Sequence, residues 1–316
     1  MKRLLAALMA MLLVLSSAAF AEISLEETEL EDDELTVSPD GMVSNALPVD
    51  FSGGCVPLTS GYSEMAYEDP TIKVSITYKE TKEYTKAYKG RTMGYWVVDI
   101  ILGNASQLRT AAAESFYTET ALPVETIAER VNAVVAFNAD YFSRHNEGFA
   151  VRQGELIRDK LKGARDVLLI DEDGDFHVYH QPKKGELSTT VNGKKVTNAF
   201  YFGPILVEDG QVPDKLPSFT YLRPEKYYAR LALCQVDTLH YKVILTTMEQ
   251  DYVLGIRLND FADLCQKEGA KIAYNLDGGY STTLYFNHER LNAQKRVNFR
   301  DVPDILYFAS AWSGEE

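Results

Sequence analysis

The feature that most constrains the fold is a series of short apolar segments, each of strand length and bounded by turn residues. Segments 71–80 and 95–102 have the patterns of a half-buried and a buried strand, and 166–180 is typical of a hairpin. Further strand-like segments are 134–143, 199–213, 228–237, 240–248, 271–276 and 303–310. Only two stretches show helical spacing. The pattern predicts an α+β fold of mixed, largely antiparallel β-sheets with a few packed helices.

The two helical stretches, 123–133 and 260–268, each carry one apolar face. Pro123 opens the first, Asn259 is expected to cap the second, and Gly269 should end it. The side chains predicted to face inward are Val124, Ile127, Ala128, Val131, Phe261, Leu264 and Cys265.

Residues 1–21 have the pattern of a secretory signal peptide. Two basic residues precede the apolar run 4–15, and Ala19-Phe20-Ala21 fits a cleavage site. The run is shorter than the roughly 18–20 apolar residues that a membrane span needs, and no later segment predicts a span. We therefore expect a protein that is secreted or associated with the cell envelope. A retained N-terminal anchor is the alternative.

The chain is acidic, with a formal net charge of −14, which disfavours binding to nucleic acid. Eight of the fourteen residues in 22–35 are Asp or Glu, and none is aromatic. Such a segment has too little apolar surface to fold by itself. We expect residues 22–57 to be an acidic disordered linker and residues 58–316 to form a single large domain.

The three cysteines, Cys55, Cys234 and Cys265, are too few for a disulfide framework in an exported domain of this size. Cys234 lies in an apolar run and Cys265 on a helical face, where a thiol behaves as a small apolar group. We expect no catalytic cysteine.

The stretch IAYNLDGGYSTTLYF, residues 272–286, places polar residues between two apolar strands. Asp277 follows the first strand directly. Gly278 and Gly279 allow a sharp turn whose amides can point outward, and hydroxyl residues occupy 281–283. Such donors beside a carboxylate suit an anionic ligand and proton transfer. A tight Asp-Gly-Gly hairpin capped by hydroxyls is the alternative.

Six segments follow one another in the chain: FNADYFS, GFAVRQGELIRD, FGPILVEDGQV, ARLALCQVD, the segment 255–286 that contains the Asp-Gly-Gly turn, and RDVPDILYF. In this order, over residues 133–310, they resemble the phosphodiester glycosidase family. The resemblance implies hydrolysis of the bond between a sugar's anomeric carbon and a phosphate that carries a second substituent. Bacterial members are often labelled exopolysaccharide-biosynthesis proteins, so the expected substrate is a phosphodiester-linked glycan of the envelope or an exopolysaccharide.

The resemblance also implies a set of site residues. The family's Asn-Gly-Gly segment falls on Asn138, Ala139 and Asp140, and its late arginine falls on Arg300. The arginine of its Arg-Thr-Ala strand matches Arg230, although a leucine follows where the family has threonine.

The family's Asp-Gly-Gly-Gly-Ser motif falls on residues 277–281, with Tyr280 in place of the third glycine. Tyr280 is expected to narrow or reshape the site, and the departures at Tyr280 and Ala139 leave room for a protein that binds glycan without turnover.

The chemistry of such a bond suggests a role for each residue. Phosphate is a good leaving group, so its departure needs charge stabilisation more than strong acid catalysis. Arginine grips phosphate through paired N–H donors, and a carboxylate can activate water or stabilise an oxocarbenium-like centre. We expect Asp277 and Asp140 to be catalytic, with Glu147 as a weaker third carboxylate. The expected substrate-binding residues are Asn138, Arg230, Gly278, Gly279, Ser281, Thr282 and Arg300. A surface or ion-paired Arg230 and a turn-capping Asp140 are the alternatives.

No cofactor or metal site is expected. His177 and His180 are three apart on a strand and so lie on opposite faces. In DEDGD, the twelfth position counted from Asp171 is Pro182 where a calcium loop has Glu, which favours a turn. Carboxylates alone could hold a hard cation such as calcium, but the sequence does not show that they do.

The favoured hypothesis is an exported hydrolase that cleaves a sugar-1-phosphodiester bond. The first alternative is a non-catalytic glycan-binding module of the cell envelope that keeps the same cleft. The second is an envelope scaffold that uses the acidic tail for interactions.

Overall fold

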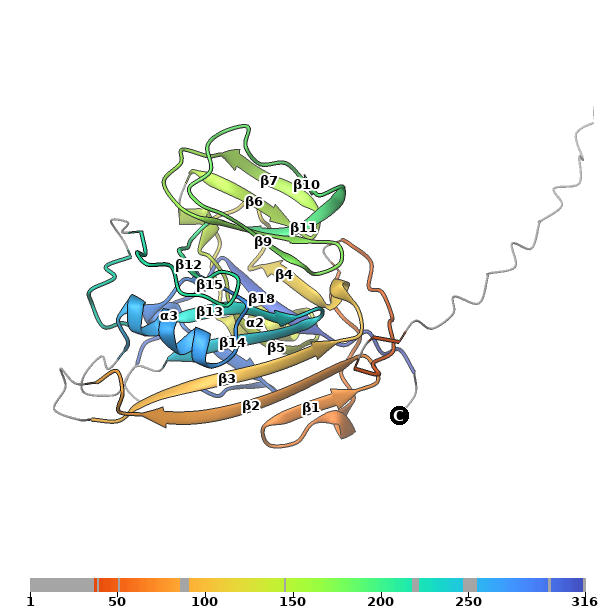
Figure 1. Ribbon diagram of the computed structural model, residues 1–316. Coiled ribbons are helices and arrows are strands. Elements are labelled where there is room, and N and C mark those ends of the chain that lie inside the picture. Colours follow the sequence, from red (N-terminus) through yellow and green to blue (C-terminus); the bar gives the residue numbers. More distant parts are fainter. Residues whose placement is uncertain are drawn as a thin grey trace, which may run out of the picture. The chain divides into compact units, whose positions relative to one another are not determined.

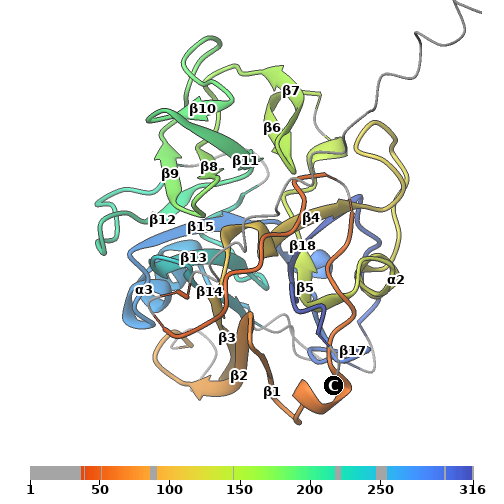
Figure 2. The same cartoon turned by 90° about the vertical axis from the view of Figure 1, so that its right-hand side faces the viewer.

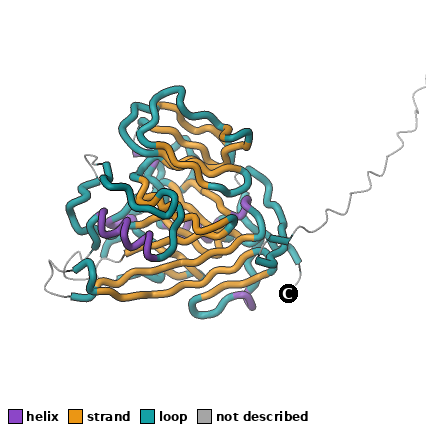
Figure 3. The backbone as a smooth tube through the Cα atoms, in the orientation of Figure 1, coloured by secondary structure: helices purple, strands orange, loops and turns teal. Residues whose placement is uncertain are grey.

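The computed structural model describes residues 37–314 apart from 39, 51, 86–90, 145, 218–221, 247–254 and 295–296 (Figure 1). The predicted signal peptide, residues 1–21, and residues 22–36 of the predicted linker lie outside the described residues. Strands dominate the described part of the chain, whose α-helices are α2 (Val124–Arg130) and α3 (Leu258–Lys267) (Figure 3). Neither these nor any other helix in the described ranges is long and apolar enough to span a membrane.

The strands form three sheets, two of which run through the middle of the domain. The seven-stranded sheet has the order β1 (Ala66–Asp69), β2 (Ile72–Thr81), β3 (Met93–Leu102), β14 (His240–Thr246), β13 (Leu231–Asp237), β15 (Ile272–Leu276), β12 (Ile205–Val207). The five-stranded sheet has the order β17 (Glu289–Arg290), β16 (Leu284–Phe286), β5 (Ala133–Asn138), β18 (Asp304–Ala309), β4 (Leu108–Ala112).

The third sheet lies at the top in Figure 1. Its order is β7 (Glu155–Lys160), β6 (Gly148–Arg152), β11 (Lys194–Phe200), β8 (Val167–Asp171), β9 (Phe176–Tyr179), and β10 (Thr190–Val191) pairs with β11. Every ladder between described strands is antiparallel, as in β13 with β15 and β5 with β18. The expectation of mixed sheets in an α+β fold is therefore corrected to a mostly β, antiparallel fold. Short hairpins, such as β1–β2 and β13–β14, make many of the connections, and only parallel pairs need long crossovers.

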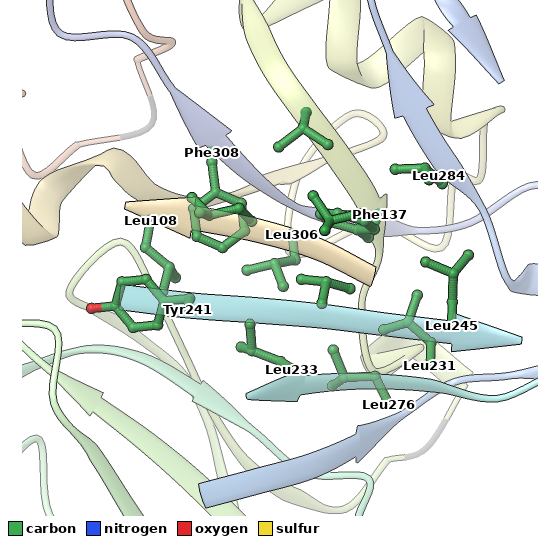
Figure 4. Close-up of a cluster of buried hydrophobic side chains, with 14 of the residues drawn as sticks. Leu108, Phe137, Leu231, Leu233, Tyr241, Leu245, Leu276, Leu284, Leu306 and Phe308 are labelled. Atoms are coloured by element: carbon green, nitrogen blue, oxygen red, sulfur yellow. The ribbon is translucent and has the colours of Figure 1, made fainter. Parts of the chain in front are cut away.

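Alternation along the strands explains the layers. On β13, Leu231 and Leu233 face the core between the seven-stranded and five-stranded sheets, while Ala232 and Cys234 face α3. Figure 4 shows the inner face, where leucines of β13, β14 and β15 meet aromatic and aliphatic side chains of β4, β5 and β18. Both faces of the seven-stranded sheet are therefore buried along much of its length.

The two helices cover opposite sides of this pair of sheets (Figure 2). The inward faces predicted for them are buried, and Gly269 has the expected left-handed conformation at the end of α3. The start of α3 was predicted wrongly: Asn259 lies inside the helix and Arg257 is the N-cap. The reason is tertiary, because the N–H of Leu258 donates to the carbonyl of Pro224 and needs no side-chain cap.

Parts of the segment before residue 58 pack on the domain. Met42 and Leu47 are buried. Arg109, 1% exposed, donates through Nη2 to the carbonyls of Pro48 at 3.0 Å and Ser52 at 2.8 Å. Part of the predicted linker therefore contributes contacts to the domain, because the buried guanidinium of Arg109 needs these carbonyls.

Candidate active site

The Asp-Gly-Gly motif lies where the seven-stranded and five-stranded sheets meet. β15 ends at Leu276, and β5 ends at Asn138. The backbone N–H of Asp277 donates to the carbonyl of Ala139 at 3.2 Å and so ties the two strand ends together. Asp277 and Asp140, both predicted to be catalytic, therefore follow neighbouring strand ends.

Asn138 fixes this junction through its side chain. Its Nδ2 donates to the carbonyl of Asp277 at 2.7 Å, and its Oδ1 accepts from the N–H of Thr283 at 3.1 Å. We expected Asn138 to bind the substrate. The structure instead commits both ends of the amide to the backbone of the motif, as a buried amide requires.

The two glycines are needed by the turn itself. A Cβ on Gly278 would lie 2.5 Å from the carbonyl oxygen of Ala229, and Gly279 has a φ of +62°. Contrary to our expectation, their backbone N–H groups are bound within the protein and do not point outward. The N–H of Gly278 donates to Asp277 Oδ1 at 3.0 Å, and that of Gly279 donates to the Ala229 carbonyl at 2.8 Å.

A buried arginine joins two carboxylates beside the motif. Arg152, at the end of β6, is fully buried. Its Nη2 lies 2.7 Å from Asp140 Oδ1, and its Nε donates to Asp304 Oδ2 at 3.2 Å. The other oxygen of Asp140 accepts from the N–H of Tyr201 at 2.8 Å. Residues from all three sheets are thereby brought together: Arg152 from the six-stranded sheet, Asp140 and Asp304 from the five-stranded sheet, and Asp277 from the seven-stranded sheet.

This cluster contains three carboxyl groups and one guanidinium, and burial disfavours the ionised form of a carboxyl group. Burial raises the pKa of Asp304 to about 7; Arg152 opposes the rise, and Asp140 and Asp277 add to it. Burial likewise raises the pKa of Asp277 to about 6, against the lowering effect of Arg300. Asp277 is partly exposed as a residue, but its Oδ2 is buried. Carboxylates with pKa values this near neutrality can take up and release protons at working pH.

Four buried polar atoms in this region have no hydrogen-bond partner among the described residues. They are Asp277 Oδ2, Ser281 Oγ, Thr282 Oγ1 and Asp304 Oδ1. The Ser281 hydroxyl is near enough to lower the pKa of Asp277, but no hydrogen bond of normal geometry joins them. A buried polar group without a partner costs about 1–3 kcal/mol. Four in one region therefore favour this region as a place where water or a polar ligand binds.

Arg300 is an exposed cation beside the motif. Its N–H donates to the carbonyl of Tyr280 at 2.9 Å, and its guanidinium carbon lies 5.4 Å from the centre of the Tyr141 ring. Its charge lowers the pKa of Asp277, so the two side chains are close enough to interact. The structure thus brings Arg300 to the predicted site.

Arg230 is placed differently from our expectation. Its Nη1 donates to the carbonyl of Leu222 at 3.2 Å, and its Nη2 donates to the carbonyls of Arg223 and Lys226, each at 3.2 Å. Its Nε donates to the carbonyl of Ile256 at 3.4 Å. Burial lowers the pKa of Arg230 to about 10. Every guanidinium nitrogen is thus bound to backbone, so the structure gives Arg230 the task of joining loops in place of gripping phosphate.

Glu147, the weaker third carboxylate, borders the same region: it lines a small cavity with Asp140, Arg158 and Tyr201. A larger cavity of about 430 Å³ lies between the loop after β4 and the end of α2. None of the predicted site residues lines it, so it does not bear on the chemistry described above.

The Asp-rich segment 171–175 is a hairpin turn, as predicted. Asp171 Oδ1 accepts from the N–H groups of Asp173 and Asp175, each at 3.0 Å. Lys194 Nζ lies 2.7 Å from Asp173 and 3.6 Å from Asp175, so a lysine supplies the positive charge there. In the described ranges, no group of three His, Cys, Asp or Glu residues is arranged to hold a metal ion.

Sequence reasoning missed Arg152 and Asp304. Both lie in segments that carry the family resemblance, GFAVRQGELIRD and RDVPDILYF. A charged residue at the end of an apolar strand was the available signal, because such a residue is buried only when it is paired.

Comparison with known proteins settles the relationship. Residues 131–309, more than half of the chain, match the phosphodiester glycosidase family. The chain belongs to this family. It is accordingly a phosphodiester glycosidase, a hydrolase, and the resemblance found in the sequence is confirmed. No curated protein matches the chain significantly.

Two solved structures are similar to this phosphodiester glycosidase. The first is the zebrafish N-acetylglucosamine-1-phosphodiester alpha-N-acetylglucosaminidase catalytic domain auto-inhibited by its pro-peptide. It has 16% identity and a TM-score of 0.61, and the match covers 83% of this chain and 87% of that one. The second is a hypothetical protein from Synechocystis, with 16% identity, a TM-score of 0.56, and coverage of 75% and 62%. Identities this low show a shared fold.

Proposed function

We propose that this phosphodiester glycosidase is an exported enzyme that hydrolyses a sugar-1-phosphodiester bond in an envelope glycan or exopolysaccharide. In this reaction the anomeric carbon–oxygen bond breaks and the phosphate leaves with the electron pair as a phosphomonoester. A water oxygen bonds to the anomeric carbon, and a proton of that water passes to a carboxylate and then to solvent.

The observation that carries the proposal is the set of unpartnered buried polar atoms around Asp277. Its carboxylate is ionised above pH 6 and serves to activate the water or to stabilise the oxocarbenium-like centre. The free hydroxyls of Ser281 and Thr282 donate to substrate oxygens. Arg300 neutralises the departing phosphate, which is the charge that develops in the transition state.

Three buried residues next to these groups support the chemistry: Asp140, Arg152 and Asp304. Arg152 compensates Asp140 where both side chains are shielded from solvent, and burial raises the pKa of Asp304 to about 7. Asp304 Oδ1 has no partner among the described residues and is thus able to donate its proton to a substrate oxygen. Burial raises the pKa of both Asp277 and Asp304, so these two carboxyl groups are suited to proton exchange near neutral pH.

The sequence supports the proposed export. The apolar run 4–15 followed by Ala19-Phe20-Ala21 has the pattern of a signal peptide. N-terminal mass spectrometry of the protein recovered from its producing cells checks this: a mature chain that begins near Glu22 outside the cytoplasm supports export, and an intact Met1 on cytoplasmic protein contradicts it.

A panel of sugar-1-phosphate diesters with a para-nitrophenyl group as the second alcohol tests the activity. N-acetylglucosamine is the first sugar to try, because the similar zebrafish enzyme is named for that sugar. In water labelled with oxygen-18, glycosidase cleavage places the label on the released sugar. Label on phosphate would instead show attack at phosphorus and would refute the proposal.

Two variants make the assay specific to the site. Asp277→Asn should lower turnover by roughly two to four orders of magnitude, whereas Asp159→Asn, on an exposed position of β7, should leave it unchanged. Binding of the diesters without turnover by the wild-type protein would support the alternative, a glycan-binding module that uses the same cleft.

A further inference from the structure

Arg300 is held at two points by segments that are distant in the sequence. Its backbone N–H is bound to the carbonyl of Tyr280, within the turn that follows Asp277. Its guanidinium lies over the ring of Tyr141, within the turn that follows Asp140. An exposed arginine has many rotamers, so an aromatic ring beneath the guanidinium narrows the positions that it samples.

Tyr141 adopts a backbone conformation that is uncommon for a bulky aromatic residue. Its φ is +58°, in the left-handed region, where glycine, asparagine and aspartate are favoured. Strained residues of this kind persist where the surrounding structure requires them, and they cluster at functional sites. Here the strained residue directly follows Asp140 and places its ring beneath Arg300, the cation whose charge acts on Asp277.

We propose that Tyr141 is a positioning residue that holds the Arg300 guanidinium beside Asp277, where it receives the anionic phosphate of the substrate. The identity of the ligand rests on the proposed function, but the coupling between the two side chains does not. The residue acts through Arg300 and need not touch the reacting atoms.

This role predicts opposite responses of stability and binding. Tyr141→Asn removes the ring and introduces a residue that tolerates the left-handed conformation, so the melting temperature should stay the same or rise. Affinity for phosphate should nevertheless fall roughly two- to fivefold, the scale of an exposed cation–π contact. Tyr141→Phe keeps the ring and should bind phosphate within twofold of wild type.

The experiment uses inorganic phosphate as the probe and calorimetry with the folded protein at pH 7.5. Arg300→Gln should weaken phosphate binding roughly tenfold or more. Tyr141→Asn should have no further effect in the Arg300→Gln background, because its action requires that arginine. Gln181→Asn is the matched control: Gln181 is exposed and left-handed, with φ of +48°, on the loop after β9, and its replacement should leave phosphate affinity unchanged.

The proposal is overturned if wild-type protein does not bind phosphate, if Tyr141→Asn binds it as tightly as wild type, or if the loss persists without Arg300. Loss of phosphate binding in Tyr141→Phe would also overturn it, because the ring is then not the element that matters. No turnover is measured here. A chain that follows the expected binding pattern but hydrolyses no diester keeps this inference and refutes only the proposed function.

Discussion

The replacement Asp277→Asn should change stability in a way that depends on pH. In the folded protein the pKa of Asp277 is about 6, above the ordinary value of 3.8, because burial penalises the ionised form. The difference is about 2 pKa units, equivalent to about 3 kcal/mol. Since the folded pKa is raised, the folded state binds the proton more tightly than the unfolded state. The cost is absent below about pH 4, grows between pH 4 and 6, and is complete above pH 6.

The amide that replaces the carboxylate in this variant is uncharged at every pH and does not incur this cost. Relative to wild type, Asp277→Asn should therefore be more stable by up to about 3 kcal/mol at pH 8 and by well under 1 kcal/mol at pH 4. Over the same range, turnover should be nearly lost. A gain in stability with a loss of activity is the signature of a charged group held in a functional site at the expense of folding.

Urea unfolding followed by circular dichroism at pH 4, 6 and 8 measures the difference, with Asp159→Asn as the control for a change of charge at an exposed position. The difference between wild type and Asp277→Asn should grow with pH, while that for Asp159→Asn should stay within about 0.5 kcal/mol. The reasoning is refuted if Asp277→Asn destabilises the protein equally at pH 4 and pH 8, because the carboxylate would then be a structural hydrogen-bond acceptor.

Three further changes test the structural parts of the site. Arg152→Met should destabilise the protein by about 3–5 kcal/mol in urea unfolding, because Asp140 and Asp304 lose the cation that lies between them; a loss below 1 kcal/mol would show that this cation does not hold the cluster together. Gly278→Ala should lower the free energy of unfolding by about 1–3 kcal/mol, since its Cβ would meet the Ala229 carbonyl oxygen. Normal stability with weaker diester binding would instead support the expected role of Gly278 in binding substrate. Deletion of residues 22–57 should lower the melting temperature by many degrees, because it leaves Arg109 buried without its carbonyl partners; an unchanged temperature would return those residues to the status of a linker.

Sequence reasoning identified the elements that local pattern encodes. The inward residues of α3 were found correctly because a helical face repeats every three to four residues, whatever it packs against. The beginning of α3 was missed because the Pro224 carbonyl, distant in sequence, accepts the first N–H of the helix. The two arginines differ in the same way. The order of the family segments predicts Arg300 beside the motif, whereas no local sequence pattern predicts the loop carbonyls that bind Arg230.

The sequence by itself determined that Asp277 follows a buried strand and begins a turn that needs glycine, because strand alternation and backbone conformation are local properties. It also determined the family, through the order of several such segments. Only the tertiary structure decided the environment of that aspartate. Arg152 pairs with Asp140 twelve residues away and with Asp304 152 residues away, and these contacts depend on how three sheets pack. Burial and the neighbouring charges raise the pKa of Asp277, and both are properties of the packed molecule that no stretch of sequence carries alone.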